Sequence, residues 1–266
     1  MKPRRKKRPR KRRKSGIYVL PTLFTSASLF CGFYAIIAAI HTKFETAAIA
    51  ILISWVLDSL DGKIARLTHT TSHFGAEYDS LSDLVAFGVA PAVLAFEWAL
   101  GPFGRLGWLA CFMYVICGAL RLARFNVQKN SLEPNYFKGL PIPAAASLIA
   151  SLVLFTTAFG GAPESRHTLI IVLIYILSFL MVSSIDYLSF KEVELGRRKP
   201  FNVLVAFILI FIVIAYRPKI MLFFILVSYV VSGPVITIYR LRKKRLKAKR
   251  LLGDAPQPKE IKAVDP

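Results

Sequence analysis

The chain has 266 residues, 55% of them hydrophobic, and its mean hydropathy is +0.52. Most apolar residues lie in long runs, which excludes an ordinary soluble globular domain and indicates an integral helical membrane protein. The net charge of +21 is concentrated in two runs near the ends, so it does not indicate a basic folded domain that binds nucleic acid.

The two basic runs predict cytosolic tails. Eleven Lys and Arg residues lie within 2–14, and eight lie within 240–250. Such runs stay solvated on the cytosolic side, and near anionic headgroups each basic residue contributes about 1 kcal/mol of attraction. We therefore expect the tails, 1–16 and 240–266, to meet anionic membrane lipids and not nucleic acid. We expect the second tail to be disordered.

Eight apolar segments are predicted to cross the membrane as helices. They span 17–40, 45–63, 80–99, 104–122, 140–160, 167–186, 201–216 and 219–239. If the N-terminus is cytosolic, eight crossings place 31 of the 36 Lys and Arg residues on the cytosolic side. This asymmetry predicts that both termini are cytosolic, although a bundle of six crossings would also satisfy it.

Acidic residues cluster in one stretch between apolar segments. Five of the 15 acids lie within the 26 residues from Asp58 to Asp83. Asp58 and Asp61 are spaced i, i+3, and Asp79 and Asp83 are spaced i, i+4, so each pair lies on one face of a helix. The topology places both pairs at the cytosolic boundary, on either side of a short polar loop at 67–74. Carboxylates at such a boundary usually face a partner or a polar cavity.

Four clustered carboxylates repel one another unless cations neutralise them. Oxygen ligands favour Mg²⁺ or Mn²⁺, with Ca²⁺ as a further candidate, and two such ions can brace a phosphoryl group during its displacement. Gly62, Ala65 and Gly75 leave the helix surface bare beside the acids, so that a ligand or a neighbouring helix can approach the backbone. Arg66 offers a planar fork suited to phosphate oxygens.

The alternative is that the acids only form structural ion pairs. Their candidate partners are Lys63, Arg66, Arg121 and Arg124. A cation transporter is a second alternative, but its acids would be expected near the bilayer midplane, on broken helices. Two helical pairs of acids at one boundary, with glycines beside them, favour a metal-bound phosphate ester over both alternatives.

The pattern Asp58-x2-Asp61-Gly62-x2-Ala65-Arg66-x8-Gly75-x3-Asp79-x3-Asp83 resembles the signature of the CDP-alcohol phosphatidyltransferases at every fixed position. The resemblance implies an all-α polytopic membrane protein with a six-helix catalytic core at 17–190. Segment 191–239 would then add two C-terminal transmembrane helices. It also implies a CDP-linked lipid donor, two divalent metal ions, displacement of CMP by an alcohol, and a homodimer.

The same resemblance implies roles for individual residues. Asp58, Asp61 and Asp79 match the metal-binding acids, and Asp83 matches the fourth acid, which also reaches the metal site and is the general base. The positions that line the nucleotide and pyrophosphate are Gly62, Ala65, Arg66 and Gly75, with Ser72 as a further candidate for a nucleotide contact.

Four segments, one of which overlaps the signature, resemble bacterial phosphatidylserine synthases. These segments are 21–33, 74–91, 119–126 and 136–146. Thr22 and Ser28 stand where members of the family often carry asparagine. The resemblance implies that the donor is CDP-diacylglycerol and the acceptor L-serine, in a bacterial inner membrane with the active site at the cytosolic face.

The acceptor's carboxylate would need a cation near the acids. Arg121 and Arg124 are candidates, with Lys138 behind them, and the alternative is that all three are boundary residues that fix the topology. Within the family, the acceptor could instead be glycerol 3-phosphate or an inositol phosphate. Because those acceptors carry a phosphate, they should demand more basic residues around the pocket.

Overall fold

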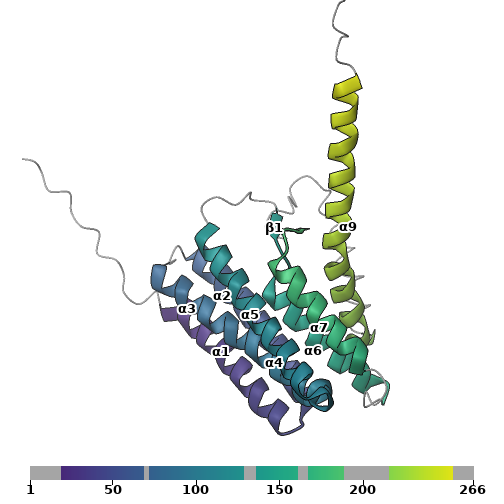
Figure 1. Cartoon of the computed structure of the whole chain (residues 1–266). Helices are drawn as coiled ribbons and strands as arrows, with labels where there is room; N and C mark the ends of the chain where they lie inside the picture. Colours follow the sequence, from purple (N-terminus) through teal and green to yellow (C-terminus); the bar gives the residue numbers. More distant parts are fainter. Residues whose placement is uncertain (1–18, 69–71, 129–135, 161–166, 189–215, 254–266) are drawn as a thin grey trace, which may run out of the picture.

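The computed structural model describes residues 19–68, 72–128, 136–160, 167–188 and 216–253, which form a bundle of helices with one small pair of strands (Figure 1). Helices long and apolar enough to cross a membrane cover Thr22–Ile40, His73–Phe103, Arg105–Val127 and Pro218–Arg240. Shorter apolar helices cover Ile142–Ala158 and Thr168–Val182. The predicted class, an all-α polytopic membrane protein, is confirmed.

Helices α1 (Val19–Ile40) and α2 (Phe44–Leu67) form an antiparallel pair with small buried alanines between them. Such residues let helix backbones approach closely. Ser28 and Ser54 face each other across this interface, with their hydroxyls 2.8 Å apart, and each hydroxyl also lies within hydrogen-bonding distance of the other residue's backbone carbonyl. Ser28 therefore joins α1 to α2 by hydrogen bonds.

The third crossing is continuously helical but irregular. It runs through α3 (His73–Asp83), the π-helical turn η1 (Leu84–Val89), α4 (Ala90–Ala95), the π-helical turn η2 (Phe96–Leu100) and the short 3₁₀ turn η3 (Gly101–Phe103). Pro91 has no N–H, so the carbonyl of Phe87 loses its usual helical donor. The buried hydroxyl of Tyr114 donates to that carbonyl at 3.1 Å. A neighbouring helix thus satisfies the backbone group that the proline leaves open.

Glycine at position 32 allows α1 to touch this irregular crossing. A Cβ at Gly32 would come within 2.6 Å of the Cα of Ala86 in η1, closer than packed atoms tolerate. The contact holds α1 against the start of the third crossing, which carries Asp79 and Asp83.

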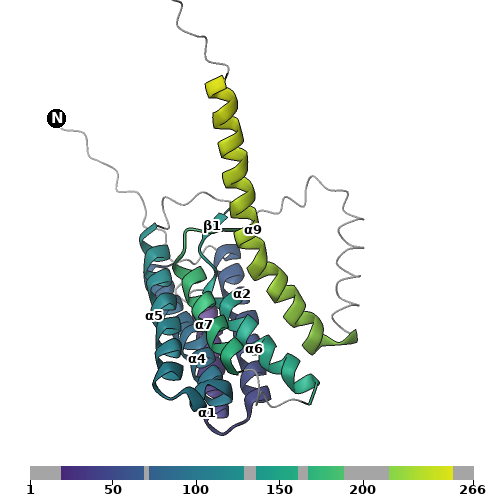
Figure 2. The same ribbon diagram turned by 45° about the vertical axis from the view of Figure 1, so that its right-hand side comes forward.

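Helices α5 (Arg105–Gln128), α6 (Ile142–Ala158) and α7 (His167–Val182) complete the predicted sequence of crossings up to Val182. Strands β1 (Tyr136–Lys138) and β2 (Asp186–Leu188), which the sequence did not predict, pair antiparallel with Lys138 opposite Asp186. The pair lies above α6 and α7 and beside α9 (Figures 1 and 2).

Helix α9 (Pro218–Gly253) lies along the side of the bundle and continues beyond it (Figure 2). An ion pair between Lys219 and Glu45 joins the start of α9 to α2. Residues 240–253 are helical and not disordered as expected, because Leu, Lys, Arg and Ala are strong helix formers that extend the apolar helix. Apart from Tyr216, the predicted segment 201–216 lies outside the described residues, so its crossing stays a prediction.

Candidate functional site

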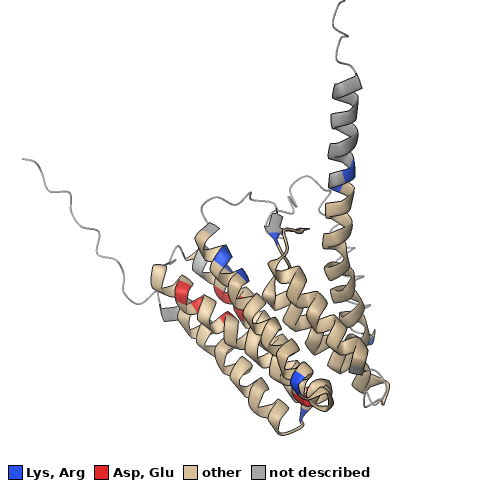
Figure 3. Ribbon diagram, viewed as in Figure 1, with Lys and Arg blue, Asp and Glu red and all other residues tan. Residues whose placement is uncertain are grey.

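Three aspartates from two helices converge at one end of the bundle. One carboxylate oxygen from each of Asp58, Asp61 and Asp79 lies within 4.8 Å of the other two. Asp58 and Asp61 come from the last turns of α2, and Asp79 comes from α3. Figure 3 shows these acidic segments (red) close to basic segments (blue) at the end of α5. The three acids therefore form a compact anionic centre.

Asp83 extends this centre from one turn further along α3. Its carboxyl group lies within hydrogen-bonding distance of the Asp58 carboxyl group. Two carboxylates in such contact repel unless a proton or a cation lies between them. All four acids therefore form one continuous cluster, in which Asp83 flanks the other three.

Thr25 of α1 also belongs to the site, although the sequence analysis gave it no role. Its hydroxyl donates to Oδ2 of Asp61 at 2.7 Å, and its backbone carbonyl accepts from Ser82 at 3.2 Å. Thr22, Thr25 and Ser28 are spaced three residues apart, so a polar stripe on the first helix was a visible signal. This hydrogen bond fixes the orientation of one carboxylate in the centre.

The donor set fits a hard divalent cation. It consists of carboxylate oxygens from two converging helices, which are the ligands that Mg²⁺ and Mn²⁺ favour, and a hydroxyl orients one of them. Among the described side chains, no Lys or Arg nitrogen lies within 4.0 Å of Asp58, Asp61 or Asp83. These carboxylates are therefore not explained as ion pairs with Lys63, Arg121 or Arg124.

The other residues matched by the signature lie around the acids. A Cβ at Gly62 would meet no described atom within 4 Å, so this glycine leaves open space and is not needed for helix packing. Ser72 begins α3, and its hydroxyl accepts a hydrogen bond from the N–H of Gly75 at 3.0 Å, which gives it a capping role. The side chains of Ala65 and Arg66 lie outside the described part of the structure, so their roles stay predictions.

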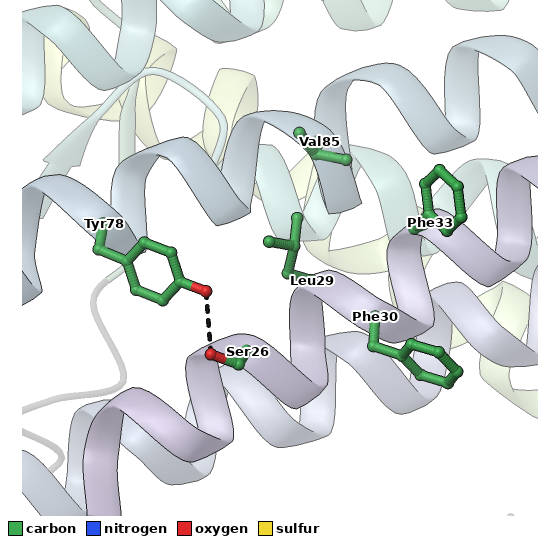
Figure 4. Close-up of a pocket in the computed structure, with 6 residues that line it drawn as sticks. All are labelled: Ser26, Leu29, Phe30, Phe33, Tyr78 and Val85. Carbon is green, nitrogen blue, oxygen red and sulfur yellow. Dashed lines mark hydrogen bonds between the residues drawn. The ribbon is translucent and has the colours of Figure 1, made fainter. Parts of the chain in front are cut away.

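An open apolar groove runs between α1 and the third crossing (Figure 4). Its volume is about 460 Å³, and it is lined by Ser26, Leu29, Phe30, Phe33, Tyr78 and Val85. The hydroxyls of Ser26 and Tyr78 lie 2.9 Å apart at one end of the groove. The groove therefore lies between α1 and the crossing that carries Asp79 and Asp83.

The three basic candidates differ in their surroundings. Arg121 faces the acids and interacts electrostatically with Asp83. Its Nε is buried and has no hydrogen-bond acceptor among the described residues, a state that costs roughly 1–3 kcal/mol. Arg124 instead donates to the backbone carbonyl of Val182 at 3.3 Å, at the end of α7, and Lys138 is exposed. Arg121 is thus the cation best placed to meet a ligand.

Asn126 connects this basic side to the acidic side. Its amide donates to the hydroxyl of Ser80 at 2.9 Å, which joins the end of α5 to α3. Asn126 lies on α5 beyond Arg121, and Ser80 directly follows Asp79 on α3. A direct polar contact therefore joins the helix of Arg121 to the helix of Asp79.

Comparison with known proteins identifies the family of the chain. The family model described as CDP-alcohol phosphatidyltransferase matches residues 18–181. The chain is 42% identical over 196 residues to a CDP-diacylglycerol–serine O-phosphatidyltransferase of Helicobacter pylori, a match that covers 74% of this chain and 83% of that protein.

Two other relatives come from other organisms. A protein of the same name from Bacillus subtilis is 36% identical over 173 residues, covering 65% of this chain and 92% of that protein. An archaetidylserine synthase of Methanothermobacter thermautotrophicus is 39% identical over 170 residues, covering 63% of this chain and 69% of that protein. The matched signature, the converging acids and these relatives together show that the chain is a multi-pass membrane transferase that belongs to the CDP-alcohol phosphatidyltransferase family.

Proposed function

We propose that the protein transfers the phosphatidyl group of CDP-diacylglycerol to the hydroxyl of L-serine, giving phosphatidylserine and CMP. The observation that carries this proposal is the convergence of Asp58, Asp61 and Asp79 with Asp83 alongside. The names of the relatives support L-serine as the acceptor. Two are named as CDP-diacylglycerol–serine O-phosphatidyltransferases and one as an archaetidylserine synthase. These names differ in the lipid that they specify, but all of them contain serine.

Asp58, Asp61 and Asp79 would hold divalent cations, with Mg²⁺ and Mn²⁺ as the best candidates, and Asp83 would reach the same centre. When bound, these ions offset the charge of the diphosphate and make CMP a better leaving group. Thr25 keeps the Asp61 carboxylate in its binding orientation. The open space at Gly62 lets the pyrophosphate and nucleotide approach the backbone of α2, with Ala65, Arg66, Ser72 and Gly75 completing that surface.

Asp83 would act as the general base. An alcohol hydroxyl hardly ionises at neutral pH, so a positioned carboxylate must accept its proton as attack proceeds. The bond between the serine oxygen and the lipid-bearing phosphorus forms, and the bond from that phosphorus to the oxygen of CMP breaks. The proton passes to the Asp83 carboxylate. Asp83 suits this role because it flanks the other three acids.

Arg121 would bind the carboxylate of serine, since it faces Asp83 and has a buried donor to offer. The groove beside Tyr78 would take an acyl chain of the donor, because it is open, is lined mostly by apolar side chains and lies along the helices that carry the acids. The predicted topology places this end of the bundle at the cytosolic face of a bacterial inner membrane. Serine and CMP would exchange with the cytosol there while the lipid stays in the bilayer.

The experiment that tests this proposal is an acceptor panel. Purified protein in detergent with Mn²⁺ or Mg²⁺ and CDP-diacylglycerol receives L-serine, glycerol 3-phosphate or an inositol phosphate, and CMP release is measured. We expect release only with L-serine, and none with any acceptor after a chelator is added. Release with glycerol 3-phosphate and none with serine would show that the proposed acceptor is wrong. Release that persists with the chelator would show that the reaction does not need a divalent metal ion.

A further inference from the structure

Helix α1 carries no acidic residue, yet it joins the two helices that supply the acids. The hydroxyl of Thr25 donates to the Asp61 carboxylate of α2 at 2.7 Å, and the backbone carbonyl of Thr25 accepts from the Ser82 hydroxyl of α3 at 3.2 Å. One residue of α1 thus contacts both helices through two different atoms. Because all three residues are buried, water competes little for either hydrogen bond.

The position of Ser82 on α3 ties this contact to the acids of that helix. Ser82 lies three residues after Asp79, on the same helical face, and directly before Asp83. In a regular α-helix the carbonyl of Thr25 already accepts the N–H four residues further on. The hydrogen bond from Ser82 is therefore not needed to keep α1 helical, and what it adds is a link from α1 to the turn of α3 that carries the acids.

A second pair of hydroxyls holds α1 in register with α2. Ser28 lies one turn after Thr25, and its hydroxyl is 2.8 Å from that of Ser54 on α2. Ser54 precedes Asp61 by two turns, so the two residues share one face of α2. Ser28 and Ser54 thus fix α1 to α2, and Ser82 fixes the same stretch of α1 to α3.

Helices α1 and α3 also meet at the surface. The hydroxyls of Ser26 and Tyr78 lie 2.9 Å apart, but both residues are more exposed than Thr25 and Ser82 (Figure 4). Water competes for an exposed hydrogen bond, so it constrains the two helices less than a buried one. We therefore expect the buried contact to determine how α3 lies against Thr25.

The geometry of the acids makes such a link consequential. One carboxylate oxygen from each of Asp58, Asp61 and Asp79 lies within 4.8 Å of the other two, and these oxygens come from both α2 and α3. A small shift between the two helices would separate the oxygens that have to meet one ion. Groups that orient metal ligands typically contribute tenfold to a hundredfold to metal affinity.

We propose that Ser82 is a positioning residue for the metal centre. Acting through Thr25, it fixes the carboxylate of Asp61 on α2 relative to the acids of α3. The proposal rests on the proposed function, because it assumes that these acids bind divalent ions. Ser82 acts only through its neighbour, so its loss weakens metal binding without removing a ligand.

The first test measures the binding of Mn²⁺ to the purified protein in detergent, with and without CMP, from the electron paramagnetic resonance signal of free Mn²⁺. We expect Ser82→Ala to raise the Kd about fivefold, which is less than for the loss of a group that touches a ligand. Ser178→Ala is the matched control, because Ser178 is also buried but its hydroxyl donates to the carbonyl of Ile174 on its own helix, α7, at 2.7 Å. An unchanged Kd in Ser82→Ala, or an equal rise in the control, would overturn the proposal.

A double-mutant cycle with Thr25→Val separates positioning from packing. This variant removes the hydroxyl that orients Asp61 but keeps the backbone carbonyl that Ser82 contacts. If Ser82 acts through Thr25, then Ser82→Ala should change the Kd by less than about twofold in the Thr25→Val background. The same fold-change in both backgrounds would show that Ser82 does not act through Thr25.

Steady-state CMP release provides an independent measurement. In Ser82→Ala the Mn²⁺ concentration for half-maximal activity should rise about fivefold, while the KM for L-serine stays within about twofold. An equal rise in both would indicate a general loosening of the site and contradict the proposal. If wild-type protein binds no Mn²⁺ in either condition, the metal centre of the proposed function fails. That result differs from equally tight Mn²⁺ binding by the wild type and Ser82→Ala, which would refute only the role of Ser82.

Discussion

The two sides of the site are built in different ways. The acidic side comes from one stretch of 26 residues on α2 and α3, and Thr25 of α1 orients it. The basic side is assembled from α5, β2 and α9, which are far apart in the sequence. Under the proposed function, the residues for the chemistry of the diphosphate come from one local stretch, whereas those for recognition of the acceptor depend on tertiary contacts.

The two sides share one structural device. A proline removes a backbone donor in each, and a tyrosine from another element replaces it: Tyr114 serves the carbonyl of Phe87, and Tyr187 serves the carbonyl of Val230. The first pair lies within the segment that the family model matches. The second pair lies beyond that segment.

The largest expected effect is on the acidic side. Asp83→Asn removes the proposed base but keeps the shape of the side chain, so we expect kcat to fall between about a hundredfold and ten-thousandfold. CMP release with saturating serine measures it. Glu97→Gln is the control, because Glu97 is exposed near the other end of the third crossing. Turnover above about a tenth of the wild-type rate would contradict the role of Asp83 as base.

Gly62→Ala tests whether the open space on α2 serves the donor. Alanine is the better helix former by about 1 kcal/mol, and no described atom obstructs its Cβ. Thermal stability should therefore stay the same or rise, while kcat/KM for CDP-diacylglycerol falls by about tenfold or more, as expected for a misplaced substrate. Gly101→Ala, distant from the acids, should leave activity unchanged. A fully active Gly62→Ala variant would show that CDP-diacylglycerol does not bind against this surface.

Thr25→Val keeps the size of the side chain and removes its hydrogen bond to Asp61. Groups that orient metal ligands typically contribute tenfold to a hundredfold to metal affinity. We expect the Mn²⁺ concentration for half-maximal activity to rise by about tenfold, with a smaller change in the KM for serine. Thr157→Val at the far end of α6 is the control. Equal metal requirements in the two variants would show that Thr25 only packs α1.

The smallest expected effect concerns the hydrogen bond from Tyr187 that supports the basic side. Tyr187→Phe leaves the carbonyl of Val230 without its donor, so unfolding free energy should fall by roughly 1–2 kcal/mol. In a Pro234→Ala background the new N–H can bond that carbonyl, and the same change should cost much less. Unfolding in detergent of the two single variants and the double variant measures this difference. Additive losses would show that the tyrosine does not replace the proline's missing donor.

Much of this molecule was predictable from sequence. Long apolar runs indicated the membrane helices, and the i, i+3 and i, i+4 spacings predicted the faces that bring Asp58, Asp61 and Asp79 together. Both signals are local, because a helix repeats its face every few residues. The predicted roles of the individual acids remain to be tested by the variants above.

The tertiary contacts were not predictable in this way. Thr25 lies 36 residues from Asp61, and Tyr187 lies 43 residues from Val230, so no periodicity links either pair. From the sequence alone, Tyr229 is one residue of an apolar membrane helix. Only the structure shows its ring contact with Tyr187 of β2 and its electrostatic interaction with Arg121 of α5. The π-helical turns and the pairing of β1 with β2 likewise depend on neighbours that a local pattern does not show.

The most direct test of the central claim follows the oxygen of the acceptor. L-Serine labelled with ¹⁸O in its hydroxyl is supplied with CDP-diacylglycerol and Mn²⁺, and both products are analysed by mass spectrometry. If the serine hydroxyl attacks the lipid-bearing phosphorus, phosphatidylserine carries the label and CMP does not. Label in CMP, or a serine-containing lipid without label, would contradict the account.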